Sequence, residues 1–283
     1  RSGKAGTPLT DHLIIDAHAH LDTTSGFPYL GSGPDGLVAA MNRMGIRRAY
    51  VSSTWAIYGQ TRRGNDHIIE FNEVFDICQE SDDCGAFYMG RNPSERGTIL
   101  RYNFWRDTGG PRSHGSCAVY FDDGSGGQTV HGNVFLRAAG GNFGAVFVHG
   151  GHNNRVYNNI FVDCKAAMRH VRWDDATWTE WITGDLWKER LLKEVDISRS
   201  PYKERYPELT GFFEFHGAKR ANYSARNVAV RCPMLLDGDW EQKDNYVTDT
   251  DPGFVDAASM NYQLRDDSEV FQKIHDFEHI PFD

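Results

Sequence analysis

Two histidines separated by one residue, His18 and His20, end an apolar run in the stretch LIIDAHAHLD at residues 13–22. Imidazoles at this spacing can bind one divalent metal ion, which would activate water for a hydrolytic reaction. A catalytic metal ion generally needs at least three protein ligands, and nothing in the sequence brings a later histidine or aspartate beside these two. We therefore expect at most a vestigial or weak metal site at His18 and His20.

A second group of candidate residues follows three similar apolar runs, CGAFYMGR (84–91), CAVYFDDG (117–124) and GAVFVHGG (144–151). When these runs are laid over one another, equivalent positions hold Ala86, Ala118 and Ala145, then Phe87, Val119 and Val146, then Tyr88, Tyr120 and Phe147. If the runs are stacked strands, the polar residues that follow them lie along one edge, and we assign catalysis to these residues: Arg91, Asp122, Asp123 and His149.

The adjacent carboxylates Asp122 and Asp123 suit glycoside hydrolysis. This reaction uses a carboxyl acid and a carboxylate base or nucleophile, about 5 Å apart for retention of configuration and roughly 6.5–9.5 Å apart for inversion. Because side chains alternate along a strand, one of the two would point inward unless a turn separates them. We favour Asp123 as the more exposed member, with Asp122 as its partner or as a turn former. The pair Asp82 and Asp83 is the next candidate.

Other interpretations of the same residues stay open. A polysaccharide lyase would need a base such as Arg91 or Lys165, and calcium at an acidic edge would neutralise a uronate carboxylate. Asp-Asp-Gly is also a common turn sequence, and His149 before two glycines can cap a corner. The sequence alone does not choose between hydrolase and lyase.

Four further residues are assigned to substrate binding: Asp83, Tyr120, His152 and Trp173. Aromatic rings that face a groove can stack on sugar rings, and Trp173, Trp178 and Trp181 are candidates for this role. Their spacing is close to helical, however, and tryptophans at that spacing more often lie in a core. We favour the core for these tryptophans.

The composition argues against several classes of function. A net charge of -9 argues against a general nucleic-acid binder. No apolar run is long enough for a transmembrane helix, and the first residues, RSGKAGTPLT, lack the apolar centre of a signal peptide. The five cysteines are widely spaced without a CxxC pair, so neither a zinc knuckle nor a disulfide framework is indicated.

The elements that must position these residues follow two patterns. Residues 13–18 and 47–53 read as strands on either side of an amphipathic helix at residues 35–44, which together make a βαβ unit. From about residue 66 the chain changes to short strands broken by glycine and asparagine.

Asparagines recur in this second part, at intervals of 31, 30 and 26 residues: Asn72, Asn103, Asn133 and Asn159. Repeats of this length built from strands and turns are typical of a solenoid, whose coils bury their apolar faces by stacking. Equivalent residues of successive coils lie about 4.8 Å apart, so the asparagines would form a hydrogen-bonded ladder. Residues 174–215 interrupt the repeat with a helical pattern, and residues 225–271 return to strand-like runs that would close the solenoid.

Residues 66–283 resemble the right-handed parallel β-helix proteins of the pectate-lyase-like superfamily. The stretches that carry this resemblance are DDCGAFYMGRNPSERG, AVYFDDG, FGAVFVHGG, NNIFVDCKAA and DPGFVD. The resemblance implies an extracellular or periplasmic protein that binds and cleaves polysaccharides, as a glycoside hydrolase or a lyase.

The first 65 residues resemble a different family. The stretches IIDAHAHLD, AAMNRMGIRRAYVSS and RRGND are similar to the start of a metal-dependent amidohydrolase, which implies a TIM barrel with His18 and His20 as metal ligands. Such a barrel takes eight βα units and about 250 residues, far more than this segment holds. The chain therefore looks chimeric, and these residues can serve as a cap on the first coil.

We thus expect a mainly β protein: a right-handed parallel β-helix at residues 66–283 with a helical insertion at about 174–215, preceded by an incomplete βαβ segment at residues 1–65. The expected function is binding and cleavage of a polysaccharide or oligosaccharide, with no nucleic-acid or membrane partner. No cofactor is required, although calcium in the β-helix or a divalent metal at His18 and His20 is compatible with the sequence. The alternatives are a metal-dependent amidohydrolase and a non-catalytic glycan-binding or structural solenoid.

Overall fold

A computed structural model describes residues 14–20, 46–52, 64–79, 81–109, 114–214 and 221–282, with the backbone alone for the first two ranges. The chain divides into two compact units, Arg1–Arg63 and Gly64–Asp283. In the first unit, β1 (Ile14–His20) and β2 (Ile46–Ser52) pair in parallel. The helix expected at residues 35–44 and the side chains of His18 and His20 lie outside what the structure describes.

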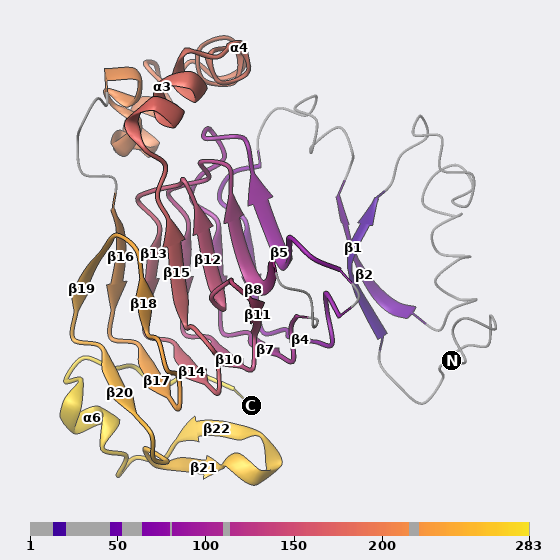
Figure 1. Cartoon of the computed structure of the whole chain (residues 1–283), viewed down its shortest axis with the longest axis vertical. Helices are drawn as coiled ribbons and strands as arrows, with labels where there is room; N and C mark the ends of the chain where they lie inside the picture. The colour runs from indigo at the N-terminus through magenta and orange to yellow at the C-terminus, as the bar shows by residue number, and fades with distance from the viewer. Residues whose placement is uncertain are drawn as a thin grey trace. The chain divides into compact units, whose positions relative to one another are not determined.

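Residues 64–282 are built around three long parallel sheets (Figure 1). Successive turns of the chain place one strand in each sheet, and each strand pairs with its equivalents in the neighbouring turns. Sheet I contains β3 (Ile68–Glu70), β6 (Ile99–Arg101), β9 (Thr129–His131), β13 (Arg155–Tyr157), β16 (Asn222–Ala225) and β19 (Trp240–Lys243). Sheet II contains β4 (Glu73–Phe75), β7 (Phe104–Arg106), β10 (Val134–Leu136), β14 (Ile160–Val162), β17 (Val228–Val230) and β20 (Tyr246–Thr248).

Sheet III contains β5 (Cys84–Gly90), β8 (Gly115–Asp122), β12 (Val146–His149), β15 (Met168–Val171) and β18 (Leu236–Asp237), and the short β11 (Ala139–Gly141) joins it antiparallel to β8. The register predicted from the aligned runs is confirmed, because Tyr120 lies opposite Tyr88 on one side and Phe147 on the other. This arrangement is consistent with a β-helix.

The asparagine ladder lies at the corner between sheets I and II. Each side-chain amide donates to the next asparagine over 2.9–3.1 Å, in the order Asn72, Asn103, Asn133, Asn159, Asn227 and Asn245. An amide can donate and accept at once, so one residue type continues the ladder through every coil. The predicted four-residue ladder is therefore confirmed, and two later asparagines extend it.

The residue before each ladder asparagine has a positive φ, between 50° and 63°: Phe71, Tyr102, Gly132, Asn158, Arg226 and Asp244. This left-handed conformation turns the chain sharply from sheet I into sheet II. Glycine and asparagine adopt it readily, and large side chains do so at a cost.

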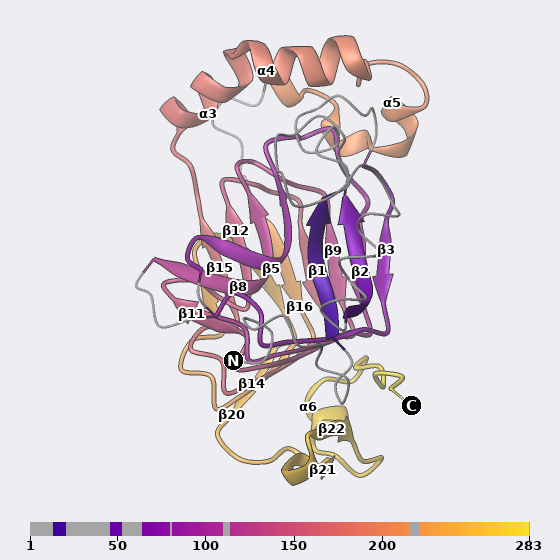
Figure 2. The same ribbon diagram turned by 90° about the vertical axis from the view of Figure 1, so that its right-hand side faces the viewer.

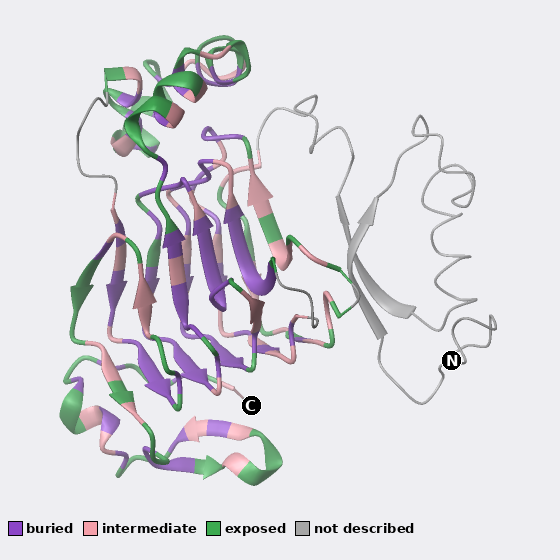
Figure 3. Cartoon of the chain, in the orientation of Figure 1, coloured by how far each residue is buried: buried purple, intermediate pink, exposed green. Residues whose placement is uncertain are grey.

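Buried residues lie along the strands of the three sheets (Figure 3), and apolar side chains from all three belong to one core cluster. Equivalent positions of sheet II place Trp105, Phe135 and Phe161 in register, with ring centroids 6.3 Å and 4.8 Å apart and nearly parallel planes. Burying each of these rings stabilises the fold by roughly 1.5–3 kcal/mol.

A helical excursion separates β15 from β16. It contains α3 (Asp175–Thr183), α4 (Asp185–Lys188), the π-helical segment Glu189–Glu194, α5 (Tyr202–Arg205) and two 3-10 turns, Pro207–Leu209 and Phe212–Glu214. The Asp174 carboxylate caps α3 by accepting from the backbone N–H of Thr177. Trp173, Trp178 and Trp187 are buried together, so these rings form a core of their own.

The C-terminal segment covers the outer face of sheet II. The sequence predicts strand-like runs at residues 225–271 that close the solenoid. Within them, residues 254–264 form an antiparallel hairpin of β21 (Phe254–Asp256) and β22 (Asn261–Leu264), which α6 (Val270–Lys273) follows. The outer face of sheet II carries Val134, Ile160 and Val228, which need an apolar cover, and the hairpin and α6 supply it. None of the helices within the described residues is both long and apolar enough to span a lipid bilayer.

Candidate functional site

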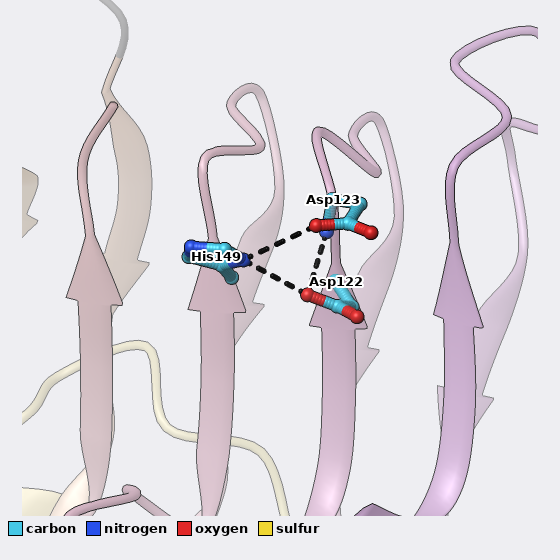
Figure 4. A group of neighbouring side chains, drawn as sticks. All are labelled: Asp122, Asp123 and His149. Carbon is cyan, nitrogen blue, oxygen red and sulfur yellow. Dashed lines mark hydrogen bonds and ion pairs between the residues drawn. The ribbon is translucent and has the colours of Figure 1, made fainter. Parts of the chain in front are cut away.

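The three candidate residues Asp122, Asp123 and His149 meet at the ends of two neighbouring strands of sheet III (Figure 4). Asp122 is the last residue of β8, and His149 is the last residue of β12. The two strands pair in parallel, with Val148 opposite Phe121, so both strands end at the same edge of the sheet. Stacking of equivalent coils therefore brings residues 27 positions apart into contact.

His149 contacts both carboxylates. Its Nδ1 lies 2.9 Å from Oδ1 of Asp122 and 3.5 Å from Oδ1 of Asp123. The carboxylate side chains are each 13% exposed and the imidazole is 34% exposed, so solvent reaches the group from one side. One oxygen from each aspartate and one nitrogen of the histidine lie within 4.8 Å of one another.

Asp122 accepts several hydrogen bonds. The Tyr88 hydroxyl donates to Oδ2 over 2.7 Å, and the backbone N–H of Asp123 donates to Oδ1 over 2.8 Å. Burial acts to raise the pKa of Asp122, but the hydrogen bonds from His149 and Tyr88 outweigh burial, and the pKa is lowered. Asp122 is therefore held as a carboxylate.

Asp123 and Arg91 form an ion pair across coils. The Arg91 Nε donates to Oδ2 of Asp123 over 2.7 Å, and the Arg91 side chain is 66% exposed. The hydrogen bond and the charge of Asp123 raise the pKa of Arg91. A raised pKa leaves even less of the side chain as the neutral guanidine that can accept a proton, so this contact disfavours Arg91 as the base of a lyase. Lys165 donates instead to the carbonyl of Gly141 over 2.8 Å.

Trp173 sits on the other side of His149. Its indole N–H donates to Nε2 of His149 over 3.1 Å. The bonds to Asp122 and Asp123 raise the pKa of His149 to about 9. The Trp173 contact opposes that shift, because an imidazolium has no lone pair at Nε2. In either protonation state Nδ1 carries a proton and points it at the carboxylates.

The same three ligand atoms are suitably spaced for a divalent metal ion. Two ligands that each lie about 2.1 Å from an ion in cis positions are about 3 Å apart, close to the 2.9 Å and 3.5 Å measured here. A nitrogen ligand suits zinc better than calcium, which prefers six to eight oxygens. A metal ion here would have to displace the Nδ1 proton and compete with Arg91 for Asp123.

The residues assigned to substrate binding lie elsewhere or are covered. Tyr120, His152 and Trp173 are 4%, 3% and 6% exposed, so their rings are packed inside the protein and present no open face to a sugar. Asp83 precedes β5, where its carboxylate accepts from the Tyr120 hydroxyl. The neighbouring Asp82 accepts from the backbone N–H of Gly115. The Tyr120 hydroxyl also interacts with the Asp122 carboxylate, so the ring of Tyr120 lies between Asp83 and the candidate site.

Two residues near the strand ends are missing from the sequence-based assignment. Tyr88 reaches Asp122, and its equivalence to Tyr120 in the repeat was a usable signal. Glu95 lies four residues after Arg91, and burial raises its pKa to about 7 against the opposing effects of Asn92 and Arg190. Arg190 also donates to the carbonyl oxygen of Arg91, which ties the helical excursion to this turn. No local pattern marks Glu95, because its burial depends on that excursion.

Comparison with known proteins adds no relative. The chain matches no protein-family model, and neither the curated proteins nor the solved structures contain a significant match to it. The parallel sheets and the asparagine ladder therefore support a β-helix on structural grounds alone.

Proposed function

We propose that residues 66–283 form a right-handed parallel β-helix of the pectate-lyase-like kind, and that it binds and cleaves a polysaccharide. The observation that carries this proposal is the cluster of Asp122, Asp123 and His149 at the strand ends of sheet III. Two carboxylates and an imidazole from successive coils form a continuous polar edge, and Arg91 extends it to a third coil. A glycan lying across the coils would contact all of these groups.

The arrangement favours hydrolysis over elimination. Elimination needs a base, and the cationic candidates are poorly suited: Asp123 holds Arg91 as a cation, and Lys165 donates to a carbonyl group. Hydrolysis needs a carboxylate and a proton donor. Asp123 would supply the carboxylate, and His149 carries a proton at Nδ1 beside it.

The spacing of the proton donor and the nucleophile indicates the stereochemical course. Asp122 is held as a carboxylate and is no proton donor, so the pair that matters is His149 and Asp123, whose Nδ1 and Oδ1 lie 3.5 Å apart. This spacing leaves no room for a water molecule on the opposite side of a sugar ring, so the geometry is nearer to that of a retaining enzyme. Asp123 would then act as the nucleophile, and Asp122 would position His149.

The test is a screen of polysaccharides for new reducing ends and for unsaturated products, with and without chelator. Asp123→Asn should abolish the release of reducing ends. Asp163→Asn is the matched control, because Asp163 also follows a strand in a left-handed conformation and also pairs with an arginine, Arg231, but lies beyond sheet II. Turnover in Asp163→Asn should equal that of the wild type.

Three outcomes separate the possible functions. Unsaturated products would indicate a lyase and contradict the hydrolase mechanism. Binding without turnover would indicate a glycan-binding solenoid, a candidate favoured by the saturation of both carboxylates with partners in the present structure. Stoichiometric zinc or manganese that is kept in Asp123→Asn but lost in His18→Ala, with activity lost in chelator, would favour the amidohydrolase alternative.

A further inference from the structure

A groove of about 610 Å³ lies between the asparagine corner of the first coils and the C-terminal hairpin. Phe71 and Tyr102 line it from the corner, and Met260 and Gln263 line it from the hairpin segment. All of its lining residues belong to the second unit. The strand-end residues Asp122, Asp123 and His149 take no part in this lining. In Figure 1 the hairpin lies below the sheets, whereas the strands of sheet III point upward toward α3 and α4.

Aromatic rings form one wall of the groove. Phe71 is 60% exposed, and its ring centroid lies 5.3 Å from that of Tyr102, with the planes tilted by 40°. The Tyr102 ring lies against Gly132 of the next coil, where a Cβ atom would come within 2.7 Å of the ring. The small residue at position 132 thus makes room for the ring of Tyr102.

The backbone at these positions is unfavourable for large side chains. Phe71 and Tyr102 both have a φ of 56°, and Met260 on the opposite wall has a φ of 61°. The equivalent corner positions of later coils hold Gly132, Asn158, Arg226 and Asp244, all in the same left-handed conformation. Among these corner positions, only Phe71 and Tyr102 carry an aromatic ring, and both line the groove.

The polar groups of the groove are uncharged or already paired. Asn261 and Gln263 supply amides from β22, and the single carboxylate in the lining, Glu73, accepts from Arg106 over 2.7 Å. Aromatic faces beside amide groups suit a ligand that has an apolar ring face and many hydroxyl groups. A ligand with a strong net charge would find no free partner among these described groups.

We propose that this groove is a second saccharide-binding site, which binds a neutral oligosaccharide by stacking on the exposed ring of Phe71, while Tyr102 supports that ring. The proposal rests on the proposed function for its ligand class, but it needs no catalysis at the groove. Its role is to hold a polysaccharide on the protein while the strand-end cluster acts on another part of the same chain.

The test measures binding by isothermal titration calorimetry, with Asp123→Asn protein so that no probe is cleaved. The probes are cello-, xylo- and manno-hexaose as neutral sugars and a hexagalacturonate as the acidic one. At least one neutral probe should bind, and Phe71→Asn should weaken its binding about tenfold or more. Ile68→Asn is the matched control, because Ile68 is 54% exposed but lies outside the groove, and it should leave binding unchanged.

The backbone conformation makes this test robust to misfolding. Asparagine is favoured at a left-handed position, so Phe71→Asn should keep or raise the Tm while it weakens binding. Tyr102→Gly should also weaken binding, because it removes the support of Phe71, but it should lower the Tm, since the Tyr102 ring packs on the core behind it and on His131. A structural role for Phe71 would instead lower the Tm and leave the affinity unchanged.

Unchanged affinity in Phe71→Asn, binding of the hexagalacturonate alone, or binding of no probe would each overturn the proposal. Failure of the proposed function has a different result: wild-type protein would show no turnover of any polysaccharide, while Phe71→Asn still lost affinity for the neutral probe.

Discussion

The indole N–H of Trp173 donates to Nε2 of His149, while Nδ1 of the same ring faces Asp122. His149 is therefore held between a donor that favours its neutral form and carboxylates that favour its charged form. Its charge state at neutral pH depends on the balance between these contacts.

Replacing the donor tests this balance. Trp173→Phe removes the N–H and should raise the pKa of His149 further above its ordinary value, because Nε2 is then free to be protonated. An NMR titration of the histidine ring protons would measure the change. Trp178→Phe is a control within the same buried cluster, and it should leave the titration of His149 unaltered.

The titration of His149 should also make the free energy of unfolding depend on pH. Because the folded-state pKa of His149 is raised to about 9, its contribution is fully present below the unfolded pKa of about 6.5 and is lost as the pH rises through 9. His149→Ala should therefore flatten the decline in unfolding free energy between pH 6.5 and 9, measured by urea denaturation. A slope equal to that of the wild type would show that His149 is not charged in the folded protein.

The hydroxyl of Tyr88 should keep Asp122 ionised. Tyr88→Phe removes one hydrogen bond to the carboxylate, so the lowered pKa of Asp122 should move upward. Stability that the ionised carboxylate supplies is lost as the pH falls through its folded pKa, and in the variant this loss should begin at a higher pH. Acid unfolding monitored by circular dichroism, together with the acidic limb of the pH–rate profile, would detect the change.

Glu95 should change the free energy of unfolding with pH in the opposite direction to Asp122. Its folded pKa of about 7 lies above the unfolded value, so its contribution is fully present below about pH 4.5 and is lost as the pH rises through 7. The difference corresponds to a stability change on the order of 3 kcal/mol. Glu95→Gln should remove this loss, as measured by urea denaturation at pH 4.5 and pH 8. The exposed Glu180→Gln should change neither value.

Substituting an asparagine at the centre of the ladder should destabilise the protein more than substituting one at its end. Asn133 is fully buried, donates to the carbonyl of Leu100 and accepts from the amide of Asn103. Asn133→Ala leaves these groups unpaired and should lower the free energy of unfolding by about 3 kcal/mol. Asn245→Ala, at the half-buried end of the ladder, should cost less. Equal losses at both sites would show that the ladder is not the source of the effect.

The repeat was the most predictable part of the fold. Asn72, Asn103 and Asn133 recur at the length of one coil, and the aligned runs placed Tyr120 beside Tyr88 and Phe147 in the observed register. Stacking converts sequence period directly into spatial contact, so the meeting of Asp122 with His149 followed from the same alignment.

The covering of these strands could not be predicted in this way. Phe143 packs on Tyr120 and Phe147, with ring centroids 5.1 Å and 3.8 Å away, and buries rings that the alternation of sheet III would leave outside. The burial of Trp173 likewise depends on the helical excursion, whose path the repeat does not encode. Side chains that come from insertions, rather than from coils, decide what is exposed at the strand ends.

The ladder also continues across the helical excursion. Asn159 donates to Asn227 over 3.0 Å although 68 positions separate them, whereas neighbouring rungs elsewhere are 18–31 positions apart. The chain thus leaves the stack and returns to the same rung geometry. The helical excursion can therefore be replaced without changing the coils on either side of it. Loops of other lengths, grafted between β15 and β16, would alter what the strand ends recognise.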